Sequence, residues 1–236
     1  MKTEIPIFIY SMVPLQTTSY KNFFEAGPFK SLLEKPGQLR YAGWDLTTNG
    51  PARIIKGDYI ELSSAERKRI QVYEDGSVFV RVAADNNYLS WGLNDTNFRE
   101  MPRLNTLALI EFSLNFCRLC SGLTMFMEPL PTEVELKVEI RNAFFDDSKL
   151  FLIPHPVSTH WFAYTDDRHV APEPSTTRRL SLASKLLQLR PDVVAFLLVR
   201  QIFLWFGASP DTIPYSSSED DLKFIDENMI RNSRSS

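Results

Sequence analysis

The sequence predicts an α+β fold, in which an antiparallel or mixed β-sheet packs around a long buried helix and a C-terminal helical segment follows. Residues 132–140 alternate apolar and charged side chains, as expected of a strand with one solvent-facing side. Residues 104–127 form an apolar run that suits one long helix. Because strand-like and helical segments do not alternate regularly along the chain, α+β is favoured over a doubly wound sheet.

Residues 70–82 predict a β-hairpin. Asp75 and Gly76 suit the two left-handed positions of a type I′ turn, and β-branched residues flank them on both sides. A two-residue loop would pair Tyr73 with Val78, and both faces of the hairpin would then carry apolar side chains. We therefore expect this hairpin to lie centrally in its sheet or to be covered on both sides.

Other segments complete the predicted order of elements. Strands are expected over residues 5–10, 39–46, 54–62 and 150–153, and helices over residues 20–26, 28–34, 177–189, 192–206 and 218–229. The proline-rich residues 154–177 predict a connector between an α+β core of residues 1–153 and a C-terminal helical segment of residues 178–236. A length of 236 residues with 44% apolar content suits one compact unit.

Charge and cysteine content narrow the class of protein. A net charge of −3 gives no overall attraction for a polyanion, which disfavours a dedicated nucleic-acid wrapper. Two cysteines cannot form a disulfide framework, and the N-terminus lacks a secretory leader, so we expect a cytoplasmic protein. The apolar run contains Glu111 and Arg118, and each central charge costs about 2.5–3.5 kcal/mol in a bilayer, so we expect a buried helix and no membrane span.

The densest group of titratable residues lies in and next to the predicted connector. His155, His160 and His169, together with Asp166 and Asp167, could supply a general base with an orienting carboxylate, or the ligands of a divalent metal. That arrangement would make the chain a metal-assisted hydrolase or nuclease. The alternative, which the sequence favours, is that these side chains are solvated members of a linker.

The two cysteines form a C-x-x-C inside the apolar run. Cys117 and Cys120 would make a Cys2His2 zinc set with His155 and His160, but the long separation and the apolar surroundings favour buried thiols. The chain contains no G-x-S-x-G, H-E-x-x-H, Walker A or G-x-G-x-x-G motif. We therefore expect no cofactor and no metal site, and a non-catalytic protein is favoured over an enzyme.

Two further groups of polar residues are candidate binding sites. Glu111, Asn115 and Arg118 form one stripe on the predicted helix, which is either the lining of a ligand pocket or the wet face of a central helix. The second group is a basic stretch with few compensating acids, which either contacts phosphate or is a solvated helix face. Its members are Arg168, Arg178, Arg179, Lys185 and Arg190.

Several phrases of the sequence resemble a known family. They are Gly-Trp-Asp-Leu at 43–46, Ala-Arg-Ile-Ile-Lys-Gly at 52–57, Tyr-Glu-Asp-Gly-Ser-Val at 73–78, Ile-Phe-Leu-Trp-Phe-Gly at 202–207 and Ile-Pro-Tyr at 213–215. Together they resemble the C-terminal region of bacterial Schlafen/AlbA-like domain proteins, which are described as DNA-binding or ATP-binding, without the AlbA-like half. The resemblance implies a bacterial cytoplasmic accessory or sensing module and assigns nucleic-acid contact to no residue of this chain.

Three functions follow from the sequence, in order of preference. The first is a non-catalytic module that binds a protein partner, a second copy of itself or a ligand, as an accessory to a nucleic-acid-associated or defence system. The second is a hydrolase or nuclease built on residues 155–169. The third is a weak nucleic-acid binder that uses the basic residues 168–190.

Overall fold

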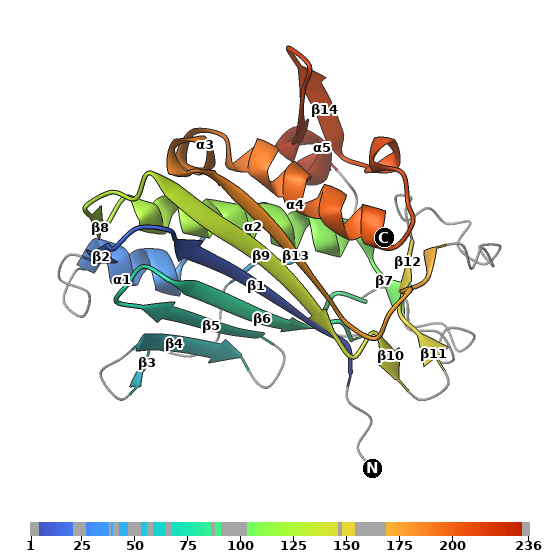
Figure 1. The fold of residues 1–236 in the computed structure, drawn as a ribbon, viewed down its shortest axis with the longest axis horizontal. Helices are drawn as coiled ribbons and strands as arrows, with labels where there is room; N and C mark the ends of the chain where they lie inside the picture. The colour runs from blue at the N-terminus through green and yellow to red at the C-terminus, as the bar shows by residue number, and fades with distance from the viewer. Residues whose placement is uncertain are drawn as a thin grey trace.

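The computed structural model describes residues 5–20, 27–37, 39, 43–46, 53–55, 59–64, 68–85, 88–90, 103–145, 148–153 and 169–232. Seven strands form one antiparallel sheet in the order β13-β9-β1-β6-β5-β4-β3 (Figure 1). Their bounds are β1 Ile7–Pro14, β3 Arg53–Ile55, β4 Tyr59–Ser64, β5 Lys68–Tyr73, β6 Val78–Ala83, β9 Glu133–Arg141 and β13 Thr176–Ala183. Together with the buried helix described next, this sheet confirms the predicted α+β class.

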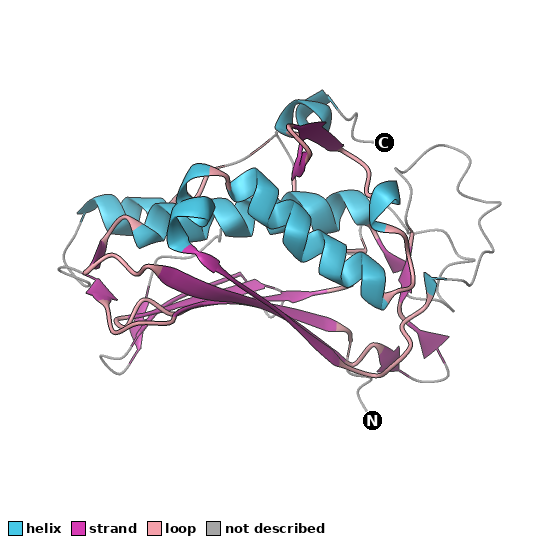
Figure 2. Cartoon of the chain, turned by 45° about the horizontal axis from the view of Figure 1, so that its top comes forward, coloured by secondary structure: helices cyan, strands magenta, loops and turns pink. Residues whose placement is uncertain are grey.

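Helices form a layer on one side of this sheet (Figure 2). Within the described residues they are α1 Gly27–Glu34, α2 Thr106–Thr124, α3 Ser184–Leu189, α4 Pro191–Trp205 and α5 Glu227–Asn232, with a 3-10 turn at Pro210–Thr212. Short strand pairs complete the fold: β2 Ser19–Tyr20 with β8 Met127–Glu128, β7 Arg103–Leu104 with β12 Phe151–Leu152, β10 Phe144–Phe145 with β11 Ser148–Lys149, and β14 Ser216–Glu219 with β15 Leu222–Ile225.

The long helix α2 is the centre of the core. Asn105 caps its first turn, because the side-chain oxygen accepts hydrogen bonds from the backbone N–H groups of Leu107 and Ala108. Sixteen of its 19 residues are buried. By length and composition α2 could cross a membrane, but 83% of the apolar window that passes this test is buried inside the protein.

The core is continuous between the two ends of the chain. Tyr10 of β1 packs edge-on against Phe112 of α2 at a ring distance of 5.0 Å, and its hydroxyl forms a 3.0 Å hydrogen bond with Ser113. The same buried cluster extends from Phe8 in β1 to Ile230 in α5. The C-terminal segment therefore shares its hydrophobic core with the sheet.

The β5-β6 hairpin is central, as predicted, but its register differs by one residue from the prediction. Val78 pairs with Val72 instead of Tyr73. A type I′ turn needs both Asp75 and Gly76 in the left-handed conformation, but only Gly76 takes it, at φ 86°. The loop is therefore one residue longer, and the backbone N–H of Tyr73 bonds to the carbonyl of Ser77. A shift of one residue exchanges the two faces of a strand, so one face of the hairpin is apolar and the other is polar.

Two predicted helices are wrong in part. Residues 177–183 belong to the strand β13, where all eight residues pair with β9, and the helix α3 starts at Ser184. Residues 218–225 belong to the β14-β15 hairpin, because Asp220 and Asp221 both take positive φ at its two-residue turn. Tertiary pairing outweighs the weak helical preference of both segments.

The predicted strands also need adjustment. The strand expected over 54–62 is a hairpin of β3 and β4. The strand expected over 150–153 shrinks to the two residues of β12. An irregular strand is expected over residues 39–46, but the described residues among them, 39 and 43–46, form no strand. The helix expected over residues 20–26 lies outside the described residues, except for Tyr20, which belongs to β2. The strand β9 and the helices α1, α2 and α4 confirm the corresponding predictions.

Candidate ligand-binding face of the sheet

One face of the seven-stranded sheet faces away from the helices, and no described element covers it (Figure 2). The strand β9 shows the difference between the faces. Its inward residues Val134, Leu136, Val138 and Ile140 are fully buried, whereas Glu135, Lys137 and Glu139 are half-buried on the other face. We call this second surface the open face.

Pairing places the outward side chains of the open face in rows that cross the strands. One row runs from Glu139 through Ile9 to Arg81 and Arg69. The next row runs from Arg179 through Lys137, Ser11, Phe79 and Gln71 to Glu61. Basic residues from four strands therefore lie close together although they are far apart in sequence.

A depression of about 290 Å³ lies in the middle of the open face. Four of its lining residues are basic and one is acidic, which gives the depression a positive balance in a chain whose net charge is −3. The basic residues are Arg69, Arg81, Lys137 and Arg141, and the acid is Glu139. Phe79 adds an aromatic ring to the lining.

Glu139 neutralises part of the positive charge at one end of the depression. Its carboxylate lies 2.5 Å from Arg141 Nε and 4.0 Å from Lys137 Nζ. The hydrogen bond from Arg141 to Glu139 raises the pKa of that guanidinium above its ordinary value, with a further contribution from the charge of Glu139. One carboxylate is shared by two cations here, so Lys137 and Arg141 together keep one positive charge in excess of Glu139.

The other end of the depression keeps its positive charge. Glu61 lies 3.8 Å from Arg69 Nε and also accepts a 3.0 Å hydrogen bond from Gln71. The guanidinium of Arg81 has no hydrogen-bond or ion-pair partner in the part of the chain that the structure describes. Arg81 is therefore the cation of the open face that is ready to meet an anion.

Three aromatic rings continue from the depression across the neighbouring strands. Tyr59 and Tyr73 are direct cross-strand partners, with ring centroids 4.9 Å apart and an interplanar angle of 31°. Tyr73 meets Phe79 edge-on, with centroids 5.6 Å apart. All three side chains are half-buried, so the open face combines an aromatic row with guanidinium groups.

The structure divides the polar stripe of α2: Glu111 and Asn115 lie in the core, whereas Arg118 lines a depression of about 250 Å³ on the surface of the helical layer. Glu111 is fully buried. The pKa of Tyr88 is raised mainly by burial, next by the charge of Asp45 and then by the charge of Glu111. Asn115 is buried and donates a 3.1 Å hydrogen bond to the backbone carbonyl of Trp44. Both side chains therefore lie among the core contacts between α2 and residues 44–88.

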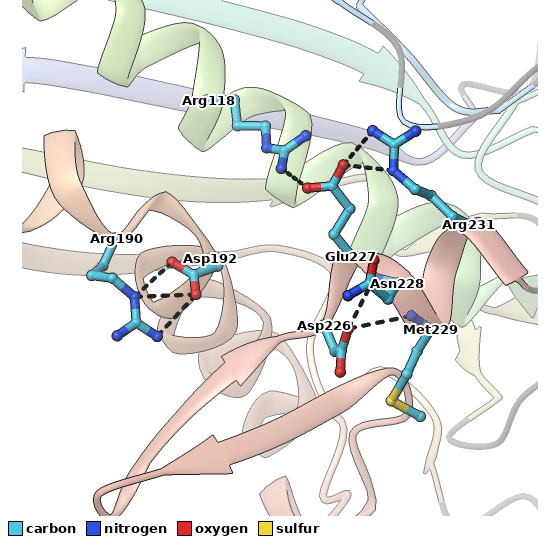
Figure 3. A network of polar contacts seen from close by, with 8 residues as sticks. All are labelled: Arg118, Arg190, Asp192, Asp226, Glu227, Asn228, Met229 and Arg231. Atoms are coloured by element: carbon cyan, nitrogen blue, oxygen red, sulfur yellow. Dashed lines mark hydrogen bonds and ion pairs between the residues drawn. The ribbon is translucent and has the colours of Figure 1, made fainter.

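Arg118 belongs to a polar network with α5 (Figure 3). Its guanidinium donates to Glu227, which also accepts a 2.7 Å hydrogen bond from Arg231 Nε. Burial raises the pKa of Glu227, but the hydrogen bonds and charges of Arg118 and Arg231 outweigh it and hold that pKa below its usual range. Arg118 thus links α2 to α5 through this ion pair with Glu227.

The described members of the predicted basic stretch do not form one surface. Arg179 faces the open side of the sheet 3.6 Å from Glu135, whereas Arg178 pairs in register with the inward residue Val138. Arg190 donates to Asp192 at 3.0–3.3 Å, and Figure 3 shows this pair. Lys185 is exposed on α3, and Arg168 lies outside the described residues.

Most of the candidate catalytic residues lie outside the described part of the chain. His155, His160, Asp166 and Asp167 lie outside the described residues, and His169 is half-buried next to the bridge between Phe151 and Val170. Cys117 and Cys120 are fully buried, and burial raises the pKa of both thiols. Within the described ranges no group of three or more His, Cys, Asp and Glu side chains is placed to hold a metal ion.

Sequence reasoning missed the residues of the open face. Arg69, Gln71 and Arg81 alternate with buried apolar residues in β5 and β6, and this alternation was a usable signal. The assumed two-residue turn concealed it, because that register placed apolar residues on both faces. Arg179 alone had been singled out as a candidate.

Comparisons with protein-family models, curated proteins and solved structures found no match to this chain. The resemblance to the C-terminal region of Schlafen/AlbA-like domain proteins therefore stays a prediction.

Proposed function

We propose that this chain is a non-catalytic binding module and that the open face of its sheet binds an extended anionic ligand. The observation that carries the proposal is the depression with four basic residues and one acidic residue, where Arg81 has no partner among the described residues. A surface on which cations outnumber anions attracts polyanions even when the net charge of the chain is negative. An accessory role in a nucleic-acid-associated or defence system, as the resemblance implies, is compatible with such a module.

The geometry of the sheet favours an extended ligand over a small enclosed one. The depression crosses four strands, β9, β1, β6 and β5, and neighbouring strands are about 4.8 Å apart. A small-molecule site would bury most of its ligand in a cleft. A polymer could instead lie across the strands and meet several cations in turn.

A direct test measures binding of a base-free phosphodiester, a fluorescein-labelled abasic dodecamer, by fluorescence anisotropy. If three or four cations meet phosphates, the plot of log affinity against log salt concentration should have a slope of about −2 to −3, at about 0.7 per contact. Arg81→Thr should make this slope less steep, by about 0.7 in magnitude. Absence of binding at low salt would overturn the proposal.

A matched control removes an arginine from the other side of the sheet. Arg200 is exposed on α4, which belongs to the helical layer. Arg200→Thr removes the same charge and should leave the affinity and its salt slope unchanged. If both variants lose binding equally, the effect comes from net charge and the open face is not the site.

A further inference from the structure

We infer that the ligand of the open face is a single-stranded nucleic acid, with bases stacked on the aromatic row and phosphates held by the neighbouring arginines. This inference rests on the proposed function, because it names the chemistry of the anion that the same face would bind. It adds a role for Tyr59, Tyr73 and Phe79 that charge alone does not give.

The aromatic row has the properties of a stacking platform. Tyr59, Tyr73 and Phe79 come from three adjacent strands, and their centroids lie 4.9 and 5.6 Å apart. The rings are half-buried, so the sheet holds them in place while part of each ring reaches solvent. Successive bases of a single strand stack on such rings without sequence preference, because every base has a π-face.

The spacing of aromatic and basic rows suits a nucleotide. Phe79 and Arg81 lie two residues apart on β6 and face the same side, so their Cα atoms are about 7 Å apart. Arg69 stands opposite Arg81, and Gln71 stands opposite Phe79. A nucleotide carries its base and its phosphate on different sides of the sugar, and the neighbouring aromatic and basic side chains offer one surface to each.

Other polyanions use less of this surface. A duplex hides the faces of its bases, so it could meet the arginines but not stack on the rings. An acidic peptide offers carboxylates to Arg81 but no flat partner for Phe79. An anionic membrane would favour aromatic side chains that protrude, whereas these three are half-buried in the sheet surface.

The experiment compares labelled dodecamers of thymidylate, of abasic phosphodiester and of glutamate, and a duplex, with the full chain by fluorescence anisotropy. Thymidylate should bind at least about fivefold more tightly than the abasic strand, since one stacked base contributes a factor of this size or more. Phe79→Leu and Tyr73→Leu should each lower the thymidylate affinity toward the abasic value and leave abasic binding unchanged. Leucine keeps an apolar side chain on the strand but removes the π-face.

Phe224→Leu is the matched control. Phe224 is a half-buried aromatic residue of β15, beside Arg190 and remote from the open face. This variant should bind both strands as the unaltered chain does. Circular dichroism checks that each variant is folded, and the two aromatic variants lie on different strands, so failure of one to fold leaves the other as the test.

The outcomes separate the two proposals. Equal affinity for thymidylate and the abasic strand would overturn base stacking and leave the anion-binding face in place. Absence of binding to either strand would overturn the proposed function itself. If the glutamate peptide or the duplex binds as tightly as thymidylate, the ligand is a protein or a double-stranded nucleic acid, and the inference is wrong.

Discussion

Arg69 and Arg81 are direct cross-strand partners in the centre of the sheet, and both side chains line the depression of the open face. Like charges directly opposite each other destabilise a β-sheet. Glu61 lies 3.8 Å from Arg69, but Arg81 has no compensating partner among the described residues. The pair keeps a positive charge that does not stabilise the fold, as expected where a surface is arranged to bind an anion.

Removal of Arg81 should stabilise the protein while it weakens binding. Arg81→Thr relieves the repulsion with Arg69 and places a residue with high β-propensity in β6, so the free energy of unfolding should rise by about 0.2–1 kcal/mol. Urea denaturation measures the change. Arg200→Thr should show no such gain, and a stability loss in Arg81→Thr would mean that its guanidinium supports the fold.

Gly76 should be essential for the stability of the β5-β6 hairpin. Its φ of 86° is left-handed, and an added Cβ would lie 2.9 Å from Met127 Cε and Pro14 Cγ. Gly76→Ala should therefore lower the free energy of unfolding by at least about 1 kcal/mol. Thermal or urea denaturation of the purified variant provides the measurement.

Gly37 supplies a matched control for this prediction. Its φ is 85°, but an added Cβ would have no neighbour within 4 Å. Gly37→Ala carries a similar backbone strain without the contact, so it should cost less than Gly76→Ala. Equal losses would show that the close approach of Met127 and Pro14 does not matter.

Asn115 should stabilise the fold and have no part in ligand binding. Asn115→Ala removes a buried side-chain hydrogen bond to the carbonyl of Trp44, and such a bond contributes a net of about 0.5–1.5 kcal/mol to stability. Denaturation should show this loss, while the affinity for the abasic dodecamer stays unchanged. Asn228 is exposed on α5, and Asn228→Ala is the control, which should change neither stability nor affinity. A binding defect in Asn115→Ala would instead support the hypothesis that the polar stripe of α2 lines a ligand site.

The attachment of α5 to α2 should weaken in acid. The pKa of Glu227 is lowered in the folded protein, so its contribution to stability is present above the ordinary value of about 4.3 and is lost as the pH falls through the folded pKa. Amide NMR shifts of α5 should report a transition below about pH 4.3. Glu227→Gln should abolish that transition, and persistence of the transition in this variant would assign it to another carboxylate.

Sequence periodicity was sufficient where each element has one clear pattern. The alternation of residues 132–140 predicted the strand β9, and the apolar run with its internal charges predicted the buried helix α2. The proline before Asp192 and the glycine after Phe206 predicted the bounds of α4. These patterns are local, so the α+β class follows from the sequence without knowledge of contacts.

The candidate site depended on information that is not local. A hairpin with one residue more in its loop moves Phe79 and Arg81 to the same face as Arg69 and Gln71. The conformation of Asp75 distinguishes the two registers, because Asp75 does not take the left-handed conformation that a type I′ turn requires. Residues 176–183 became a strand because β9 offered a complete set of backbone partners. Neither choice can be made from propensity alone.

The sequence by itself determined the fold class, the central buried helix and the absence of the common catalytic motifs. Tertiary structure decided which side chains share a surface. It placed Glu111 and Asn115 in the core and paired Arg118 and Arg190 with carboxylates. It also brought basic residues of four strands together on the open face. The physical reason is that helix and strand periodicity fix how each segment divides between core and solvent, whereas strand order and register fix its neighbours.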